Sequence, residues 1–286
     1  MPPPLSDFNA ALRLLGRALI ALQPYKDDLV LAGGMVPFLY RYHPLFSPTD
    51  VPVLLTKEAD LVVRPRLAPG RTPVAKLLEW ADFAPFEAPG YRDAPGALYF
   101  QDRGLGTTKL ATSYIEILAP MRGKPRAFIE PQKGLRAQAL RYLDLLAHEP
   151  IEIDLQEIDD LELETPCIAR LPHPGTFIIQ KILARTSGRR AAKQTSDLAQ
   201  VFDVVSLTRG RWSEMQAVLE RAALESDEWA RWIRRAIRLL AKLFSPDGDA
   251  PIEVHRIYRS MIGDSAPGEA AISAVLLAFA AAIEVR

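Results

Sequence analysis

Apolar residues near the start of the chain first recur with helical spacing and then form a short continuous run. The segment 6–22 predicts a helix, because its apolar side chains fall on one face: Phe8, Leu12, Leu15, Leu19 and Leu22. The run DDLVLAGG, residues 27–34, predicts a buried strand that ends at two glycines. Residues 35–45 then predict a helix or helical turn packed behind that strand.

Strand patterns continue through the first half of the chain. Three further apolar runs predict strands: 53–63, 97–103 and 113–120. Residues 72–86 predict a helix with Thr72 as its cap and Pro73 at its first position. The order helix, strand, helix, strand, helix, strand, strand predicts a small mixed sheet covered by helices over residues 1–165.

The pattern changes at about residue 166, after which apolar positions recur at helical spacing. Helices are predicted over four segments: 173–207, 212–226, 228–244 and 268–283. We therefore expect an α+β fold, with a mixed β-sheet flanked by helices over residues 1–165 and an α-helical domain over residues 166–286.

Composition narrows the class of protein. The chain has 286 residues, with 35 Lys and Arg against 35 Asp and Glu, so it is not an electrostatic nucleic-acid binder as a whole. Its single cysteine, Cys167, excludes an intrachain disulfide and a thiolate-rich zinc site. No signal peptide is visible, and the apolar run 270–283 is shorter than the ~20 residues that span a bilayer. We expect a soluble, cytoplasmic protein with no membrane partner.

Three carboxylates stand out against the apolar strands that carry them. Glu58 and Asp60 are two positions apart in a predicted strand, so both side chains project from the same face. Glu116 lies between Ile115 and Ile117 in another strand, where a buried acid needs a partner or a function. Together the three acids can hold Mg²⁺, whereas Glu58 and Asp60 alone are also typical of a solvated strand face. Separation of the carboxylates by more than about 6 Å would exclude a shared metal.

Gly33 and Gly34 have two interpretations. They can end a strand where a positive φ is needed. They can also let the triphosphate of a nucleotide approach the backbone, with amide groups pointing at it. The sequence alone leaves both interpretations open.

Taken in order, these features resemble the DNA polymerase β-like nucleotidyltransferase superfamily. Its pattern is a Gly-Ser or Gly-Gly, an acid-x-Asp pair on a strand and a third acid on a neighbouring strand, as in LAGG, TKEADL and YIEIL here. The resemblance implies that Glu58, Asp60 and Glu116 are catalytic metal ligands for Mg²⁺ or Mn²⁺. It also implies that Gly33 and Gly34 face the nucleoside triphosphate. Glu58 stands where the family mostly has Asp.

The second half resembles the helical segment of bacterial stand-alone nucleotidyltransferases, including the abortive-infection toxin type. The matching positions are Pro174, Lys181, Arg185, Arg189 or Arg190, Lys193, Asp197 and Gln200. The resemblance implies that Lys181, Arg185, Lys193 and Asp197 bind the nucleotide, with ATP among the candidates.

The sequence and the resemblance together predict a magnesium-dependent transferase that moves a nucleoside monophosphate from NTP to an acceptor hydroxyl. RNA such as tRNA, or a protein, is the expected acceptor, and a cognate antitoxin or regulatory protein is a further expected partner. The alternative is a catalytically degenerate relative that binds or regulates. A basic amphipathic run, RWIRRAIRLLAKLF at 231–244, can contact an RNA backbone or an acidic partner, or it can be a solvated helix face.

Overall fold

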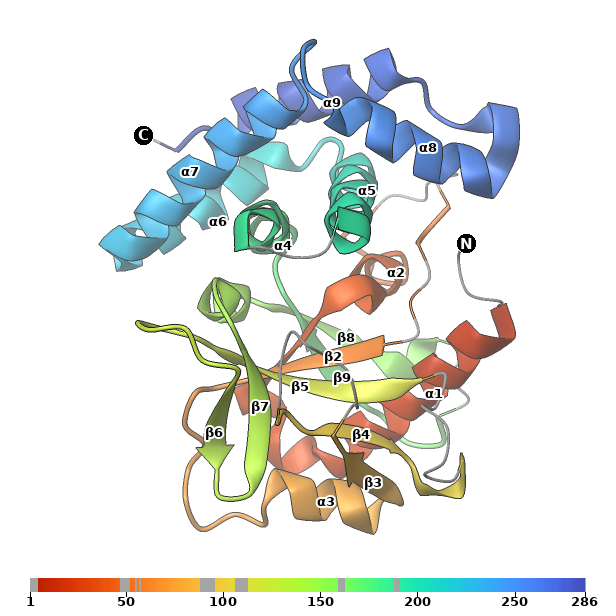
Figure 1. Cartoon of the computed structure of the whole chain (residues 1–286), viewed down its shortest axis with the longest axis vertical. Helices are drawn as coiled ribbons and strands as arrows, with labels where there is room; N and C mark the ends of the chain where they lie inside the picture. The colour runs from red at the N-terminus through yellow and green to blue at the C-terminus, as the bar shows by residue number, and fades with distance from the viewer. Residues whose placement is uncertain are drawn as a thin grey trace. The chain divides into compact units, whose positions relative to one another are not determined.

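A computed structural model describes residues 5–46, 52–54, 56, 58–87, 96–105, 113–158, 163–187 and 191–285 (Figure 1). The chain divides into two compact units. We call residues 3–36 and 55–172 the sheet unit, and residues 37–54 and 173–286 the helical unit. The predicted boundary between domains at residues 165 and 166 stays a prediction.

The sheet unit is built on a mixed sheet. Its strands are β1 (Leu29–Ala32), β2 (Glu58–Val63), β3 (Phe83–Phe86), β4 (Tyr99–Asp102), β5 (Tyr114–Pro120), β6 (Phe128–Gln132) and β7 (Leu135–Leu140). The order β1-β2-β5-β4-β3 forms one path, and β7 pairs with β5 and β6. The pairs β2–β5 and β5–β7 are parallel, and the other pairs are antiparallel. β5 is therefore the central strand between β2 on one side and β4 and β7 on the other.

The two faces of this sheet bury different side chains. Leu61 of β2 lies beside Leu19 of α1 (Leu5–Ala21), so α1 covers the face from which Leu61 projects. Val62 projects from the opposite face and packs with Leu118 of β5 in an aliphatic cluster completed by Leu143 and other buried residues. Because side chains alternate along a strand, Glu58, Asp60 and Glu116 share the face of Val62 and Leu118.

Further elements complete the sheet unit. α3 (Val74–Trp80) precedes β3, and β8 (Ile151–Asp154) pairs antiparallel with β9 (Ile168–Leu171) in a second, two-stranded sheet. Short 3₁₀ turns lie at Gln23–Asp28, Gly33–Met35, Arg103–Leu105, Leu143–Ala147 and Leu155–Glu157. Figure 1 shows α1 and α3 below the larger sheet.

The helical unit is centred on α4 (Pro174–Ala184), all of whose residues are buried. α4 packs against α5 (Ala191–Leu207), α6 (Trp212–Glu225) and α7 (Asp227–Leu243). α9 (Glu269–Ala282) packs against α5, α6, α7 and α8 (Ala250–Ile262). α4 begins at Pro174, and the His173 side chain accepts a hydrogen bond from the Gly175 amide at 3.2 Å, which caps the helix.

The predicted fold class is confirmed: the structure is α+β, with a mixed sheet flanked by helices and helices in the C-terminal part of the chain. Individual elements differ from the prediction. α2 spans only Val36–Tyr40, and the predicted helix 72–86 divides into α3 and β3. Strands β6 to β9 and helix α8 were not predicted. None of the helices within the described residues is long and apolar enough to cross a membrane.

Candidate metal centre

Strand register brings the three predicted acids together. β2 and β5 run parallel, with Asp60 opposite Glu116 and Glu58 opposite Tyr114. Carboxylate oxygens of Glu58, Asp60 and Glu116 all lie within 4.8 Å of one another. Asp60 and Glu116 are buried, each 6% exposed, whereas Glu58 is half-buried at the start of β2. The separation is below the ~6 Å limit for a shared metal.

This donor set fits a hard divalent cation. Carboxylate oxygens are the ligands that Mg²⁺ prefers, and Mg²⁺ commonly takes one or two of them and fills its shell with water and phosphate oxygens. Ligands of octahedral Mg²⁺ are about 2.9 Å apart when adjacent and about 4.2 Å apart when opposite, so the three oxygens, within 4.8 Å of one another, must draw closer by side-chain rotation to share one ion. Two buried carboxylates on one face repel each other unless a cation lies between them.

Tyr114 positions Glu58 and was not recognised in the sequence. Its hydroxyl donates a hydrogen bond to Glu58 Oε1 at 2.7 Å. The backbone amide of Glu58 also donates to Thr56 Oγ1 at 3.3 Å, which fixes the start of β2. A signal was available in the sequence, because Tyr114 is two positions before Glu116 and therefore shares its face.

An aromatic cluster borders the carboxylates. Tyr114 and Tyr99 meet edge to face, with ring centroids 5.6 Å apart, and both rings contact Phe86. Tyr99 lies opposite Glu116 in the β4–β5 pair. The acids thus lie between the aliphatic cluster around Val62 and this aromatic cluster, so the surrounding side chains are largely apolar. Low polarity strengthens the attraction between the carboxylates and a bound cation.

Gly33 follows β1 and lies against Asp60. Its φ is +69°, and a Cβ added there would lie 1.8 Å from Asp60 Oδ2 and 2.7 Å from Asp60 Cγ. The position therefore requires glycine both for its backbone conformation and for the space that the Asp60 carboxylate occupies. The turn and the nucleotide-facing interpretations of the two glycines both rest on the backbone. The space that Asp60 occupies is a further reason why residue 33 is glycine. A role for Gly33 and Gly34 in facing a nucleotide stays a prediction.

The predicted nucleotide-binding residues of the helical unit form ion pairs there. Lys181 Nζ lies 2.8 Å from Asp197 Oδ1, and both side chains are buried. Arg185 pairs with Glu253 through two contacts of 3.3 Å, and Thr195 Oγ1 donates to Glu253 at 3.0 Å. No local pattern indicates Glu253, because it is 68 residues from Arg185.

Lys193 lies in the first turn of α5 and is exposed. Of the other matched positions, Pro174 starts α4 and Gln200 is buried in α5. Arg189 and Arg190 lie outside the described residues.

A second buried ion pair lies in the helical unit. Arg41 Nη2 is 2.6 Å from Asp203 Oδ1, and the Asp203 side chain is 2% exposed. Burial raises the pKa of Asp203 to about 7, and the Arg41 guanidinium opposes that rise only partly. The two residues are 162 positions apart, so the sequence could not indicate the pair.

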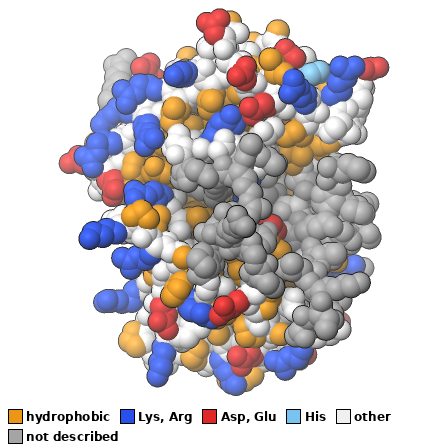
Figure 2. All heavy atoms as spheres, in the orientation of Figure 1, with side chains coloured by type: hydrophobic (Ala, Val, Ile, Leu, Met, Phe, Trp, Pro, Cys, Tyr) orange, Lys and Arg blue, Asp and Glu red, His pale blue; other side chains and the backbone are white. Residues whose placement is uncertain are grey.

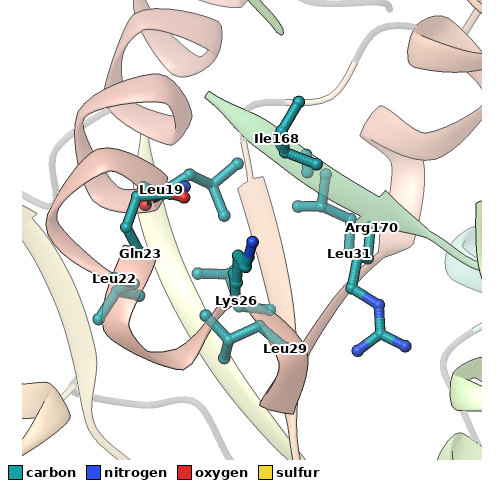
Figure 3. Close-up of a pocket in the computed structure, with 10 residues that line it drawn as sticks. Leu19, Leu22, Gln23, Lys26, Leu29, Leu31, Ile168 and Arg170 are labelled. Carbon is teal, nitrogen blue, oxygen red and sulfur yellow. Dashed lines mark hydrogen bonds between the residues drawn. The ribbon is translucent and has the colours of Figure 1, made fainter. Parts of the chain in front are cut away.

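A small cavity opens between α1, β1 and β9, lined in part by Leu19, Lys26, Leu29 and Arg170 (Figure 3). Its volume is about 10 Å³. That is room for about one water molecule and far below the ~300 Å³ of a typical ligand pocket. The cavity is therefore not a nucleotide site.

Comparison with known proteins defines the class. The sequence profile of a family described as "Nucleotidyltransferase" matches residues 13–224, well over half of the chain. The chain belongs to this nucleotidyltransferase family. Its fold is similar to a crystal structure of an antigenic nucleotidyltransferase-like protein from Paracoccidioides brasiliensis, with 14% identity, a TM-score of 0.40, and coverage of 82% of this chain and 94% of that chain. No curated protein matches the chain.

The resemblance to nucleotidyltransferases is thus confirmed at the level of the family. The bacterial abortive-infection toxin type stays a prediction.

Proposed function

We propose that the protein is a metal-dependent nucleotidyltransferase that moves a nucleoside monophosphate from an NTP to an acceptor hydroxyl. The observation that carries the proposal is the set of three carboxylates, within 4.8 Å of one another on one face of the sheet. Membership of a nucleotidyltransferase family supports the reaction type. RNA such as tRNA, or a protein, is the proposed class of acceptor.

The reaction follows from the groups at this face. A bound Mg²⁺ or Mn²⁺ would supply Lewis-acid stabilisation of the negative charge on the phosphoryl oxygens. Glu58, Asp60 and Glu116 hold the cation, and Tyr114 orients Glu58 through its hydrogen bond. The acceptor oxygen attacks the α-phosphorus of the NTP and the bond to the β-phosphate breaks, so pyrophosphate leaves. Glu116 takes the proton of the acceptor hydroxyl.

The helical unit contributes cationic groups in two ways. Arg185 and Lys193 are proposed to contact triphosphate oxygens, as the resemblance implies; Lys193 is exposed, and Arg185 would exchange its bidentate pair with Glu253 for phosphate oxygens. Lys181 and Asp197 are buried against each other, so we propose that they act on nucleotide binding by fixing α4 against α5.

Label transfer tests the proposal. The protein is incubated with an NTP labelled at the α-phosphate, with Mg²⁺ or Mn²⁺ and total RNA. Wild type is compared with Asp60→Asn and Glu116→Gln, and with Glu152→Gln, which removes an exposed acid from β8. Wild type and Glu152→Gln should label the acceptor, and the two other variants should lose at least the 10- to 100-fold that weakened metal sites typically lose.

Equal labelling by wild type and Asp60→Asn would refute the catalytic assignment. If NTP raises the melting temperature of the wild-type protein but no acceptor is labelled, the protein is the degenerate binding relative. Label transfer and the melting temperature are measured on the same protein preparation. Total protein is added to the label-transfer assay as a second pool of acceptors.

A further inference from the structure

One face of α7 carries a row of cationic side chains. Its members are Arg231, Arg234, Arg235, Arg238 and Lys242, which we call the α7 stripe. Their spacing of three or four residues places them on one side of the helix. All five are exposed, and from residue 231 to the end of the helix they are the only exposed residues of α7. Figure 2 shows Lys and Arg side chains gathered at the upper left, where α7 runs in Figure 1.

The charge of the stripe is not neutralised by ion pairs within the part of the chain that the structure describes. Arg235 Nη2 donates to the hydroxyl of Thr186 at 3.3 Å, which is an uncharged partner. The acids of α7, Asp227 and Glu228, lie in its first turn, before the stripe begins. A chain with no net charge thus concentrates five positive charges on one helix face.

The geometry of the stripe matches a phosphate backbone. Eleven residues separate Arg231 from Lys242, so the stripe is about 16 Å long at ~1.5 Å per residue. A duplex carries about ten phosphates on its two strands over that length of axis, at ~1.7 Å each, and because they wind around the axis a straight stripe faces only part of them. Arginine guanidinium groups bind phosphate oxygens in pairs of hydrogen bonds, which favours them over lysine at such contacts.

Other anionic partners fit less well. A protein partner would be expected to bury apolar or aromatic side chains at the centre of the interface, whereas the exposed positions of α7 from residue 231 on are all Arg or Lys, and the neighbouring Trp232 and Leu239 are half-buried. A membrane surface would require the apolar face of the helix, but Ile233, Ile237 and Leu240 are buried in the helical unit. α7 also cannot insert into a deep groove of a nucleic-acid duplex, because one side of the helix is packed against the helical unit.

We propose that the α7 stripe binds the phosphate backbone of RNA and so brings the acceptor RNA to the protein. The choice of RNA over DNA rests on the proposed function, because RNA presents a 2′-hydroxyl at every nucleotide and has a wide, shallow groove that a packed helix can approach. Binding through phosphates makes the contact independent of base sequence.

The test measures binding of a short fluorescent hairpin RNA, without NTP or divalent metal, at several salt concentrations. Arg234→Gln/Arg238→Gln removes two charges from the stripe, and Arg256→Gln/Arg259→Gln removes two exposed charges from α8 as a matched control. Glutamine is a good helix former, so both variants should fold, as circular dichroism will verify.

If all five side chains contact phosphates of the duplex stem, wild type should lose about 500-fold in affinity between 50 and 200 mM salt, and three contacts predict about 40-fold. The stripe variant should show the smaller loss and weaker binding at 50 mM, and the α8 variant should behave as wild type. Equal salt dependence of the two double variants would overturn the proposal. Tighter binding of DNA of the same sequence, or of polyglutamate, would also overturn it.

Failure of the RNA-binding proposal can be distinguished from failure of the proposed reaction. Asp60→Asn should bind the hairpin RNA as wild type does, because Asp60 belongs to the sheet unit and binding is measured without metal. If the wild-type protein binds the hairpin RNA but transfers no label, the proposed reaction is refuted and the stripe is left in place. Intact label transfer with unaltered RNA binding in the stripe variant would refute the stripe alone.

Discussion

Replacing Gly33 with alanine is expected to damage the metal centre in two separable ways. The first is backbone strain, because Gly33 has a φ of +69°, and a side chain in that conformation costs about 1–2 kcal/mol. The second is a steric conflict: the new Cβ would lie 1.8 Å from Asp60 Oδ2, and ordinary contact begins at 3.4 Å. The carboxylate must therefore move by far more than the ~0.2 Å that metal–ligand distances tolerate.

The assay combines denaturant unfolding with calorimetric titration of Mn²⁺. Gly134→Ala is the matched control, because Gly134 has a φ of +82° with no atom within 4 Å of the added Cβ. Both variants should lose about 1–2 kcal/mol of unfolding free energy through strain, and Gly33→Ala should also lose Mn²⁺ affinity by more than ~10-fold. Equal Mn²⁺ affinity of Gly33→Ala and Gly134→Ala would refute the steric argument.

Three further changes test neighbouring parts of the account. Tyr114→Phe removes the hydrogen bond to Glu58 and should weaken Mn²⁺ binding about 10-fold by calorimetry; unchanged affinity would contradict the positioning role. Lys181→Met removes the cation that pairs with the buried Asp197 carboxylate and should cost about 3–5 kcal/mol in denaturant unfolding, with most of it regained in Lys181→Met/Asp197→Leu; a neutral single variant would argue against the pair. Burial raises the pKa of Asp203 from 3.8 to about 7, so between pH 3.8 and 7 the native protein holds a proton that the unfolded chain has released. The free energy of unfolding should therefore fall as the pH rises through this range. Asp203→Asn should lack this part of the pH dependence, and an identical slope in the variant and wild type would refute the assignment.

Local rules of strand geometry were sufficient to single out the three acids of the candidate metal centre. Alternation along a strand places Glu58 and Asp60 on one face, and an acid between two isoleucines marks Glu116 as unusual. The register that sets Asp60 opposite Glu116 joins residues 56 positions apart, and local patterns do not encode such a pairing. The resemblance to nucleotidyltransferases predicts a third acid on a neighbouring strand, and the observed register places Glu116 there.

The predictions were less complete where partners are distant in sequence. The spacing of Lys181 and Arg185 predicts a shared helix face, and their binding to a triphosphate stays a prediction, whereas their ion-pair partners, Asp197 and Glu253, lie in α5 and α8 and are not indicated by spacing. Strands such as β3, with four residues, are too short to show a clear period, so the predicted helix 72–86 ran through it. The ion-pair partners and the end of the helix before β3 are both set by tertiary contacts. Such contacts cannot be read from the spacing of residues along the chain.

The central claim is that Glu58, Asp60 and Glu116 hold one divalent site. Anomalous diffraction from crystals soaked in Mn²⁺ tests it most directly, because the metal is located without reference to activity. A peak bonded to oxygens of Glu58, Asp60 and Glu116 at roughly 2 Å is expected, and it should be lost in Asp60→Asn. Mn²⁺ bound elsewhere, with no peak between these carboxylates, would contradict it.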